Sequence, residues 1–243
     1  MSDAFLRRVA ALGQFRVGDV AAPALSRDDD HHLRAVLRAK LGEEVVVTDG
    51  VGEWAMAVVE VEGLRRVTDV ASEPAPPPRT LYLAPLKGDR SEWAVVKAVE
   101  LGVTTIVPLL SARVAVRFRS EARERVLGRW RRLANEASAQ SRRVHYPIIG
   151  EPMTPRELPA EVAVADFAGG ATWAGVSAVA IGPEGGWDDG EWGQGRQRLS
   201  LGPTVLRAET AAVAAATLLA FHGSDWVLPH DRRQMGNDES SYD

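Results

Sequence analysis

The 243-residue chain contains no cysteine, which excludes disulfides and thiolate metal sites. It has no run of about 18 consecutive uncharged apolar residues, the length that a membrane-spanning helix requires. Its first residues, MSDAFLRRVA, lack the apolar core of a signal peptide. The formal net charge is only −4, so the chain as a whole has no basic character. These absences predict a cytoplasmic protein without a membrane segment.

The positive charge is nevertheless concentrated in one part of the sequence. The segment from Arg113 to Arg143 holds ten arginines, no lysine and three glutamates, a charge of +7, which leaves −11 for the remainder. A planar guanidinium group donates two parallel hydrogen bonds to phosphate and stacks on bases. The segment therefore favours contact with RNA or DNA over a merely solvated helix face.

Four prolines within residues 74–78 (PAPPP) divide the chain into two regions of different pattern. We expect a first domain at 1–73, a stiff linker at 74–78, a second domain at 79–229 and a flexible tail at 230–243. The first domain has apolar runs separated by Asp-Gly and Gly turns, which predicts a small β-barrel that follows a helix capped by Asp30. Such barrels often bind RNA, although a fold alone does not establish a function.

After the linker, apolar strand-like runs alternate with helical patterns. The strands are expected at 80–85, 103–110, 161–166, 176–182 and 199–202. The helices are expected at 89–102 with a capping box of Asp89 and Glu92, at 120–141 with an apolar stripe (Ala122, Val126, Trp130, Leu133, Ala137), after a cap of Asp188 and Glu191, and at 209–222. The alternation predicts an α/β domain with a mostly parallel sheet covered on both faces.

Two Gly-Pro loops follow predicted strands: IGPEGGW at 181–187 and LGPTVLR at 201–207. Glycines let the backbone approach a ligand closely, and ligands bind at the carboxyl ends of strands in open α/β sheets. The two loops are therefore expected to form opposite walls of one pocket. Neither loop is a P-loop, because no Gly-Lys-Ser/Thr follows, so a nucleotide-phosphate enzyme is a remote alternative.

Four motifs, KAVELGV (97–103), QSRR (140–143), IGPEGGW (181–187) and LGPTVLRAETAA (201–212), stand in the order found in one known family. With them, the sequence resembles the SPOUT methyltransferases, and more narrowly the ribosomal RNA small subunit methyltransferase E family, which methylates N3 of a uridine in 16S rRNA. The stretch at 31–50, HHLRAVLRAKLGEEVVVTDG, resembles that family's PUA-like RNA-binding barrel. One departure is Thr204, which stands where the family often has Arg.

The resemblance implies a C-terminal SPOUT domain with a trefoil knot, a homodimer, and 16S rRNA or the small ribosomal subunit as partner. It implies S-adenosyl-L-methionine as cofactor. No metal is expected, because His31 and His32 have no evident third ligand. The residues expected to bind the cofactor lie in or beside the two loops: Phe167, Ile181, Gly182, Pro183, Glu184, Gly185, Leu201, Gly202, Val205 and Leu206. The residues expected to contact RNA are Arg34, Arg38, Arg142 and Arg143.

Uridine N3 carries a proton at neutral pH, so the methyl acceptor must be deprotonated or its anion stabilised. Arg207 is expected to stabilise negative charge on the uracil carbonyls; its alternative role is an ion pair with Glu209 or with the cofactor carboxylate. Glu209 is expected to accept the N3 proton, or alternatively to supply a favourable charge at a helix N-terminus. Glu184 is expected to fix its loop by accepting backbone N–H bonds.

Two other readings keep the same fold. One is a SPOUT methyltransferase that modifies another RNA position, which the ETAA run and the PUA-like stretch disfavour. The other is a non-catalytic RNA-binding protein of ribosome assembly. The intact glycines of both loops argue against it, because a site without a ligand has no need for close backbone approach.

Overall fold

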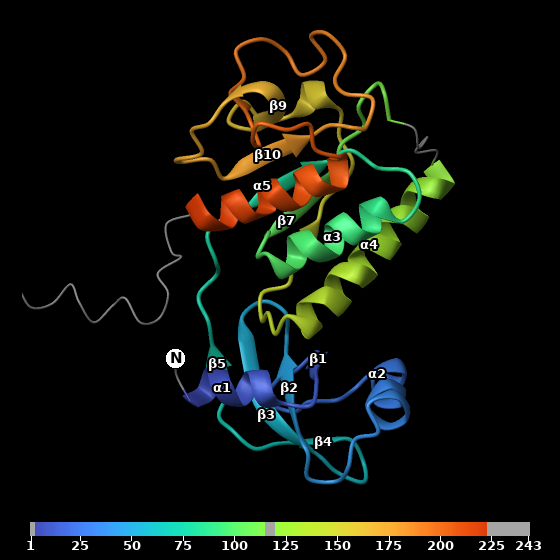
Figure 1. Ribbon diagram of the computed structural model, residues 1–243. Helices are drawn as coiled ribbons and strands as arrows, with labels where there is room; N and C mark the ends of the chain where they lie inside the picture. The colour runs from blue at the N-terminus through green and yellow to red at the C-terminus, as the bar shows by residue number, and fades with distance from the viewer. Residues whose placement is uncertain (1–2, 115–119, 223–243) are drawn as a thin grey trace, which may run out of the picture.

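The computed structural model describes residues 3–114 and 120–222. They form two parts, each built around its own β-sheet and joined through the proline-rich segment 74–78 (Figure 1). The predicted tail at 230–243 lies outside the described residues. No helix within the described ranges is long and apolar enough to cross a membrane.

The N-terminal part holds a five-stranded sheet in the order β1-β2-β3-β4, with β5 also paired to β3. Its strands are β1 (Gln14–Arg16), β2 (Glu44–Thr48), β3 (Glu53–Val59), β4 (Leu64–Arg66) and β5 (Ala71–Ser72). Strands β2 and β3 are antiparallel and Val46 faces Met56, which confirms the predicted strand pair around Asp49-Gly50. Gly50 has a φ of +81°, a conformation that glycine adopts without strain.

Three short helical elements accompany this sheet: α1 (Asp3–Ala10), α2 (Arg27–His31) and a π-helical turn η1 (His32–Val36). The predicted cap at Asp30 is wrong. Ser26 caps α2, because its hydroxyl accepts a hydrogen bond from the Asp29 amide at 3.1 Å. Asp30 lies one turn inside and pairs with Arg34 instead.

The C-terminal part holds a six-stranded sheet in the order β11-β9-β10-β6-β7-β8. Its strands are β6 (Thr80–Leu83), β7 (Thr105–Pro108), β8 (Ile148–Ile149), β9 (Ala163–Gly170), β10 (Ala178–Ile181) and β11 (Arg198–Leu199). All the neighbouring pairs in it are parallel, as the alternation of strands and helices predicted.

The three helices of this part are α3 (Arg90–Glu100), α4 (Ser120–Gln140) and α5 (Ala208–His222), and they share one core with one face of the sheet (Figure 1). Alternate strand residues, such as Leu81 and Leu83, point into that core, while Tyr82 points to the opposite face. Among the described residues, a 3-10 turn (η2, Pro155–Glu157) and loops with Trp187 and Trp192 cover the opposite face. Both faces of the sheet are therefore covered, as predicted, but the second face is covered by loops and a short turn.

The helix predicted after Asp188 does not form, and this is why the second face has a loop cover. Residues 188–197 are turns, and Gly190, Gly193 and Gly195 all have positive φ. Glycine is about 1 kcal/mol less favourable than alanine in a helix, so three within six residues outweigh the cap signal. Glu191 does accept a hydrogen bond from the Asp188 amide, at 3.0 Å, but the bond closes a turn.

The capping box predicted for α3 is also wrong. Asp89 occupies the N-cap position without a side-chain hydrogen bond, and Glu92 pairs with Arg129 of α4. The apolar stripe of α4 is confirmed where its side chains are described: Trp130 and Ala137 are buried, and Val126 and Leu133 are half-buried. The side chain of Ala122 lies outside the described part.

Helix α5 has almost no polar face. Ala212, Ala215, Ala216 and Leu219 are fully buried against α3 and the sheet, and Phe221 is exposed at the C-terminal end. A helix that is apolar all round is expected to lie in a core. Helix α5 accordingly packs in the core of the C-terminal part.

The two parts meet along residues 142–146, which follow α4. The Gly52 amide donates to the Val144 carbonyl at 3.1 Å, and the Tyr146 amide donates to the Gly50 carbonyl at 2.8 Å. The Gln14 side chain donates to the Arg143 carbonyl at 2.6 Å. Backbone bonds therefore link the N-terminal sheet to the end of α4 in addition to the proline-rich segment.

Candidate active site

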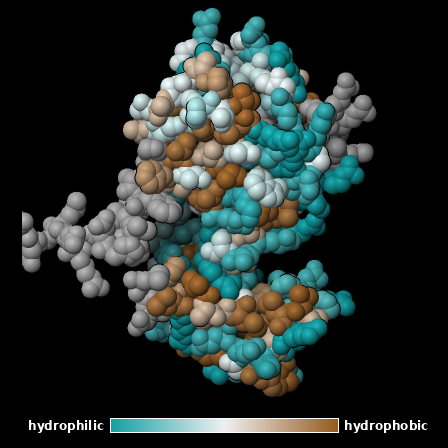
Figure 2. Space-filling model, in the orientation of Figure 1, coloured by the Kyte–Doolittle hydropathy of each residue, from teal (hydrophilic) through white to brown (hydrophobic). Residues whose placement is uncertain are grey.

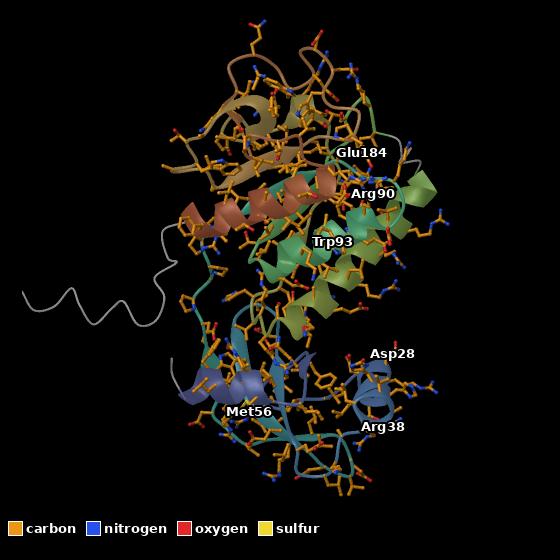
Figure 3. The ribbon with its side chains drawn as sticks, viewed as in Figure 1. Asp28, Arg38, Met56, Arg90, Trp93 and Glu184 are labelled. Carbon is orange, nitrogen blue, oxygen red and sulfur yellow. The ribbon has the colours of Figure 1, made fainter. Side chains whose placement is uncertain are left out.

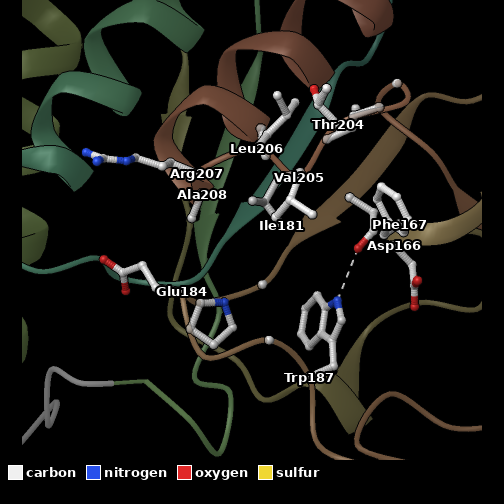
Figure 4. A pocket seen from close by; sticks show the side chains of 17 residues that line it. Asp166, Phe167, Ile181, Glu184, Trp187, Thr204, Val205, Leu206, Arg207 and Ala208 are labelled. Carbon is white, nitrogen blue, oxygen red and sulfur yellow. Dashed lines mark hydrogen bonds between the residues drawn. The ribbon is translucent and has the colours of Figure 1, made fainter.

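A pocket of about 590 Å³ opens between the two Gly-Pro loops (Figure 4). Its walls come from the middle of β9 (residues 165–167), the end of β10 with the loop that follows it, and the segment 201–208 that leads into α5. Its volume lies within the range of about 300–1,000 Å³ that is typical of small-molecule sites. The loops thus form two walls of one pocket, as expected from the sequence.

Most residues predicted to bind the cofactor line this pocket. Those found there are Phe167, Ile181, Pro183, Gly182, Glu184, Leu201, Gly202, Val205 and Leu206. Gly185 does not line it; the Gly185 carbonyl accepts a hydrogen bond from Arg113 Nη1 at 2.9 Å. The structure brings the predicted set together, while its binding role stays a prediction.

Trp187 forms part of the wall and explains the need for Gly182. A Cβ atom added at Gly182 would lie 2.8 Å from the Trp187 indole ring, too close for any side chain. The indole Nε1 donates to the Ala165 carbonyl at 3.1 Å, which fixes the ring plane beside the pocket (Figure 4). Sequence reasoning missed Trp187, although an aromatic residue directly after a glycine loop is a usable signal.

Asp166 lies at the pocket rim and is held as a carboxylate. Arg198 donates to it through Nη2 at 2.8 Å and Nε at 3.1 Å, and the Ala168 amide donates at 2.8 Å. These bonds, that of Arg198 above all, hold the pKa of Asp166 below its ordinary value. The rim therefore carries a fixed hydrogen-bond acceptor at neutral pH.

Arg207 and Glu209 do not pair with each other. The guanidinium of Arg207 is exposed at the pocket and makes no hydrogen bond or ion pair with any described residue. The Glu209 side chain is only 14% exposed, and the cation that faces it is Arg90, with Nη1 3.9 Å from Oε2. The alternative role of Arg207 as a partner of Glu209 is therefore wrong, because Glu209 turns toward α3.

Glu184 also turns toward Arg90. Its Oε1 lies 3.1 Å from Arg90 Nη1, and it accepts no backbone N–H bond from the described residues. The expectation that backbone amides hold this carboxylate is wrong, since a cation from α3 does so. Arg90 is 94 positions before Glu184, and no local pattern in the sequence connects the two.

Two of the arginines predicted to contact RNA lie beside the N-terminal sheet. Arg34 Nε donates to Asp30 at 2.8 Å, and its Nη2 donates to the Glu60 carbonyl at 3.1 Å. Arg38 is exposed, has a φ of +54°, and its guanidinium has no partner in the described part of the chain. Of these two, Arg38 keeps all its donors available.

The other two, Arg142 and Arg143, lie at the junction of the two parts. Arg143 Nη1 donates to the Val99 and Val103 carbonyls at 2.7 and 2.8 Å, and burial lowers the pKa of Arg143 to about 10. Arg142 Nη2 donates to the Ala11 carbonyl at 2.6 Å, and burial lowers the pKa of Arg142 as well. Both guanidinium groups are thus engaged by backbone oxygens, and contact with RNA stays a prediction.

Hydrophilic side chains dominate the side of the molecule where α4 lies (Figure 2). Most of the described arginines of α4 are nevertheless paired with carboxylates. Arg123 and Arg131 both contact Glu151, Arg129 contacts Glu92, and Arg132 lies 3.8 Å from Glu136. The excess positive charge read from the sequence is therefore largely balanced within the fold. Arg117 and Arg119 lie outside the described residues.

Within residues 3–114 and 120–222, no group of three or more His, Asp or Glu side chains could hold a metal ion. The described residues that line the pocket thus offer glycine-rich backbone, one unpaired guanidinium (Arg207) and two carboxylates (Asp166 and Glu184), while Glu209 does not line it.

The comparisons with known proteins agree with this geometry. Residues 73–220 match the RNA methyltransferase domain family, and residues 25–68 match the RNA methyltransferase PUA domain family. The chain is 31% identical over 234 residues to ribosomal RNA small subunit methyltransferase E of Mycobacterium bovis, covering 85% of this chain and 88% of that protein. It is 30% identical over 210 residues to the Synechocystis protein of the same name, covering 76% of this chain and 68% of that one.

Solved structures show the same similarity in three dimensions. Ribosomal RNA small subunit methyltransferase E of Neisseria gonorrhoeae, solved with bound S-adenosyl methionine, superimposes with a TM-score of 0.74 at 26% identity, covering 86% of this chain and 97% of that one. A Legionella pneumophila protein described as a methyltransferase, solved with the same cofactor, gives a TM-score of 0.76 at 28% identity, with 85% and 96% covered.

Proposed function

The chain belongs to the ribosomal RNA small subunit methyltransferase E family of RNA methyltransferases, and on that premise we propose that it methylates N3 of a uridine in 16S rRNA with S-adenosyl-L-methionine. The observation that carries the proposal is the pocket between the two Gly-Pro loops. The family relation supports the RNA substrate, and the pocket supports a small-molecule methyl donor.

The residues present fit such a cofactor. Gly182 leaves room for the Trp187 ring, and this flat ring in the pocket wall suits a flat adenine-sized group. Ile181, Leu201 and Leu206 supply apolar walls, and Asp166 supplies an acceptor for a hydroxyl or amino group. When bound there, S-adenosyl-L-methionine supplies an electrophilic methyl group.

The chain's own residues then act on the uracil ring. The unpaired guanidinium of Arg207 donates hydrogen bonds to the uracil carbonyl oxygens, where negative charge spreads when N3 loses its proton. Glu209 Oε2 is buried and has no hydrogen-bond partner among the described residues, so it can accept that proton directly or through water. The proton thus leaves N3, and the methyl group is transferred to the same nitrogen.

RNA recognition would be divided between the two parts of the chain. The match to a PUA domain supports an RNA-binding role for the N-terminal sheet, with Arg38 and Arg34 at its surface. Arg142 and Arg143 would contribute by holding this module to the methyltransferase domain, besides any direct contact. We propose the domain limits 1–73, 74–78 and 79–229 on the same grounds, with the tail at 230–243.

Three further properties belong to the proposal. The PUA-like module closes as a barrel, the loops at 181–187 and 201–207 form a trefoil knot, and two copies associate as a homodimer in the cytoplasm. The homodimer rests on the family resemblance of the sequence. The location in the cytoplasm follows from the proposed ribosomal substrate.

The test is methyl transfer from labelled S-adenosyl-L-methionine to small ribosomal subunits from a strain that lacks this protein. The product nucleoside is identified by mass spectrometry, and 3-methyluridine is the expected result. A different methylated nucleoside would assign the enzyme to another RNA position. Cofactor binding without any methyl transfer would refute the ribosomal substrate. A protein that does not bind the cofactor would share the family's fold but not its activity.

A further inference from the structure

We propose that Arg90 is a positioning residue of the methyltransferase site, which holds Glu184 and Glu209 together and so leaves Arg207 free for the substrate. This inference rests on the proposed function, because it assigns Arg207 to the uracil. It concerns a residue of α3, an element that contributes no wall to the pocket.

Arg90 lies between carboxylates from two separate parts of the site. Its Nη1 is 3.1 Å from Glu184 Oε1, in the first Gly-Pro loop, and 3.9 Å from Glu209 Oε2, in the first turn of α5. Figure 3 shows Arg90 at the start of α3 beside Glu184. One guanidinium therefore joins the loop after β10 to the helix that follows the second Gly-Pro loop.

The position of Arg90 is itself fixed. It is the first residue of α3, and its Nε donates to the Lys87 carbonyl at 3.2 Å. The Arg90 side chain is 35% exposed, whereas the Glu209 side chain is 14% exposed. The carboxylate that is harder to solvate is thus the one that most needs a cation nearby.

The charges around the pocket show what Arg90 prevents. Arg113 is engaged with Asp188 and the Gly185 carbonyl, and Arg198 with Asp166. Arg207, two residues before Glu209, is the cation at the pocket that remains unpaired among the described residues. Without Arg90, Glu209 would lose the cation that faces it, and Arg207 would be the unpaired cation nearest to it in the chain.

An Arg207–Glu209 pair would disable the site, because the guanidinium would donate its hydrogen bonds to a carboxylate and not to the uracil oxygens. Arg90 thus acts through Glu209 on the methyl-transfer step, and through Glu184 on the wall of the cofactor pocket. These two effects can be measured separately.

The test compares Arg90→Met with Arg90→Lys, and uses Arg129→Met as the matched control. Arg129 of α4 pairs with Glu92, which lies on α3 as Arg90 does, and neither residue lines the pocket. Arg90→Met is expected to lower kcat by about tenfold, within the range of coupling between contacting charged groups, while the KM for ribosomal subunits stays within about twofold. Arg90→Lys is expected to recover most of the loss, and Arg129→Met to have no effect.

The decisive readout is a pair of double-mutant cycles. In a Glu209→Gln background, Arg90→Met is expected to cause no further loss of kcat, because the carboxylate that would pair with Arg207 has been removed. In a Glu184→Gln background, Arg90→Met is expected to cause no further loss of cofactor affinity, measured by calorimetry without RNA. The same loss in both backgrounds as in the wild type would overturn the proposal.

Two other outcomes would also overturn it. A raised KM for ribosomal subunits with unchanged kcat would make Arg90 an RNA contact. A lower melting temperature for Arg90→Met and Arg90→Lys alike, with unchanged kcat and cofactor affinity, would make it only structural. If the wild-type protein methylates no ribosomal RNA, the proposed function fails, while the calorimetric cycle with Glu184 still tests the link from Arg90 to the pocket.

Discussion

The methyltransferase domain holds arginines at two ends, and the two ends use them in opposite ways. At the junction with the N-terminal domain, Arg142 and Arg143 donate to backbone carbonyls and are partly or largely removed from water. At the pocket, Arg207 has no partner in the described chain, and Arg90 is shared between two carboxylates. A guanidinium that meets carbonyls supports the fold, whereas one without partners keeps its donors for a ligand.

Helix α4 lies between these extremes. Its arginines are exposed, but most of them face glutamates of the same protein. The charge of the segment in the sequence therefore overstates the positive field that an RNA would meet. The comparison teaches that the partners of an arginine, more than its position in a basic run, indicate its role.

The largest effect is expected at the pocket. Arg207→Ala should lower kcat by about 100-fold or more, the usual cost of removing a donor that stabilises developing negative charge. Cofactor affinity and melting temperature should change little, because the side chain makes no contact that holds the fold. Single-turnover methylation and calorimetry check this; an equal loss in Arg207→Lys would support the need for the planar fork. A fall in melting temperature that matched the loss of activity would contradict the comparison.

At the junction, the effect should fall on stability. Arg143→Ala leaves two carbonyls, those of Val99 and Val103, without their charged donor. The free energy of unfolding is expected to fall by about 2–3 kcal/mol, since hydrogen bonds to charged groups contribute about 1.5–3 kcal/mol. Urea denaturation checks this value, and kcat of the folded protein should stay within about twofold. Unchanged stability with weakened RNA binding would reverse the roles given to the two ends.

A smaller effect, dependent on pH, is expected at the pocket rim. Because Arg198 holds the pKa of Asp166 below its ordinary value of 3.8, the stabilisation is fully present above about pH 4 and is lost as pH falls through the lower value of the folded state. Wild type should therefore lose more stability than Asp166→Asn between about pH 6 and about pH 3. Denaturation at both values tests the sign, and parallel losses in the two proteins would refute it.

The smallest effect is expected on α4. Arg129→Met removes an exposed pair with Glu92, and exposed ion pairs contribute little in water. Melting temperature and methylation rate should both stay within experimental error at physiological salt. A clear loss of RNA affinity in this variant would show that the pairs on α4 open to contact RNA.

Local sequence patterns predicted much of the fold. Periodicity located the strands β2, β3, β6, β7, β9, β10 and β11 and the helices α3, α4 and α5, and it missed the short strand β8. The two Gly-Pro loops predicted one pocket with two walls. Two of the errors share a cause, because in each a tertiary partner outweighed a local signal. Glu92 pairs with Arg129 and does not form the expected capping box, and Glu184 pairs with Arg90 and accepts no bond from backbone amides of the described residues.

Hydrophobic periodicity and glycine conformation act over a few residues, so the amino-acid order alone predicts which segments are buried and where the backbone can approach a ligand. Which charges meet depends on the folded chain. Arg90 and Glu209 are far apart in the chain and 3.9 Å apart in space, and the parallel sheet order brings them together. Ion pairing depends on distance in space and on burial. The sequence therefore could not show that Arg207 has no ion-pair partner among the described residues.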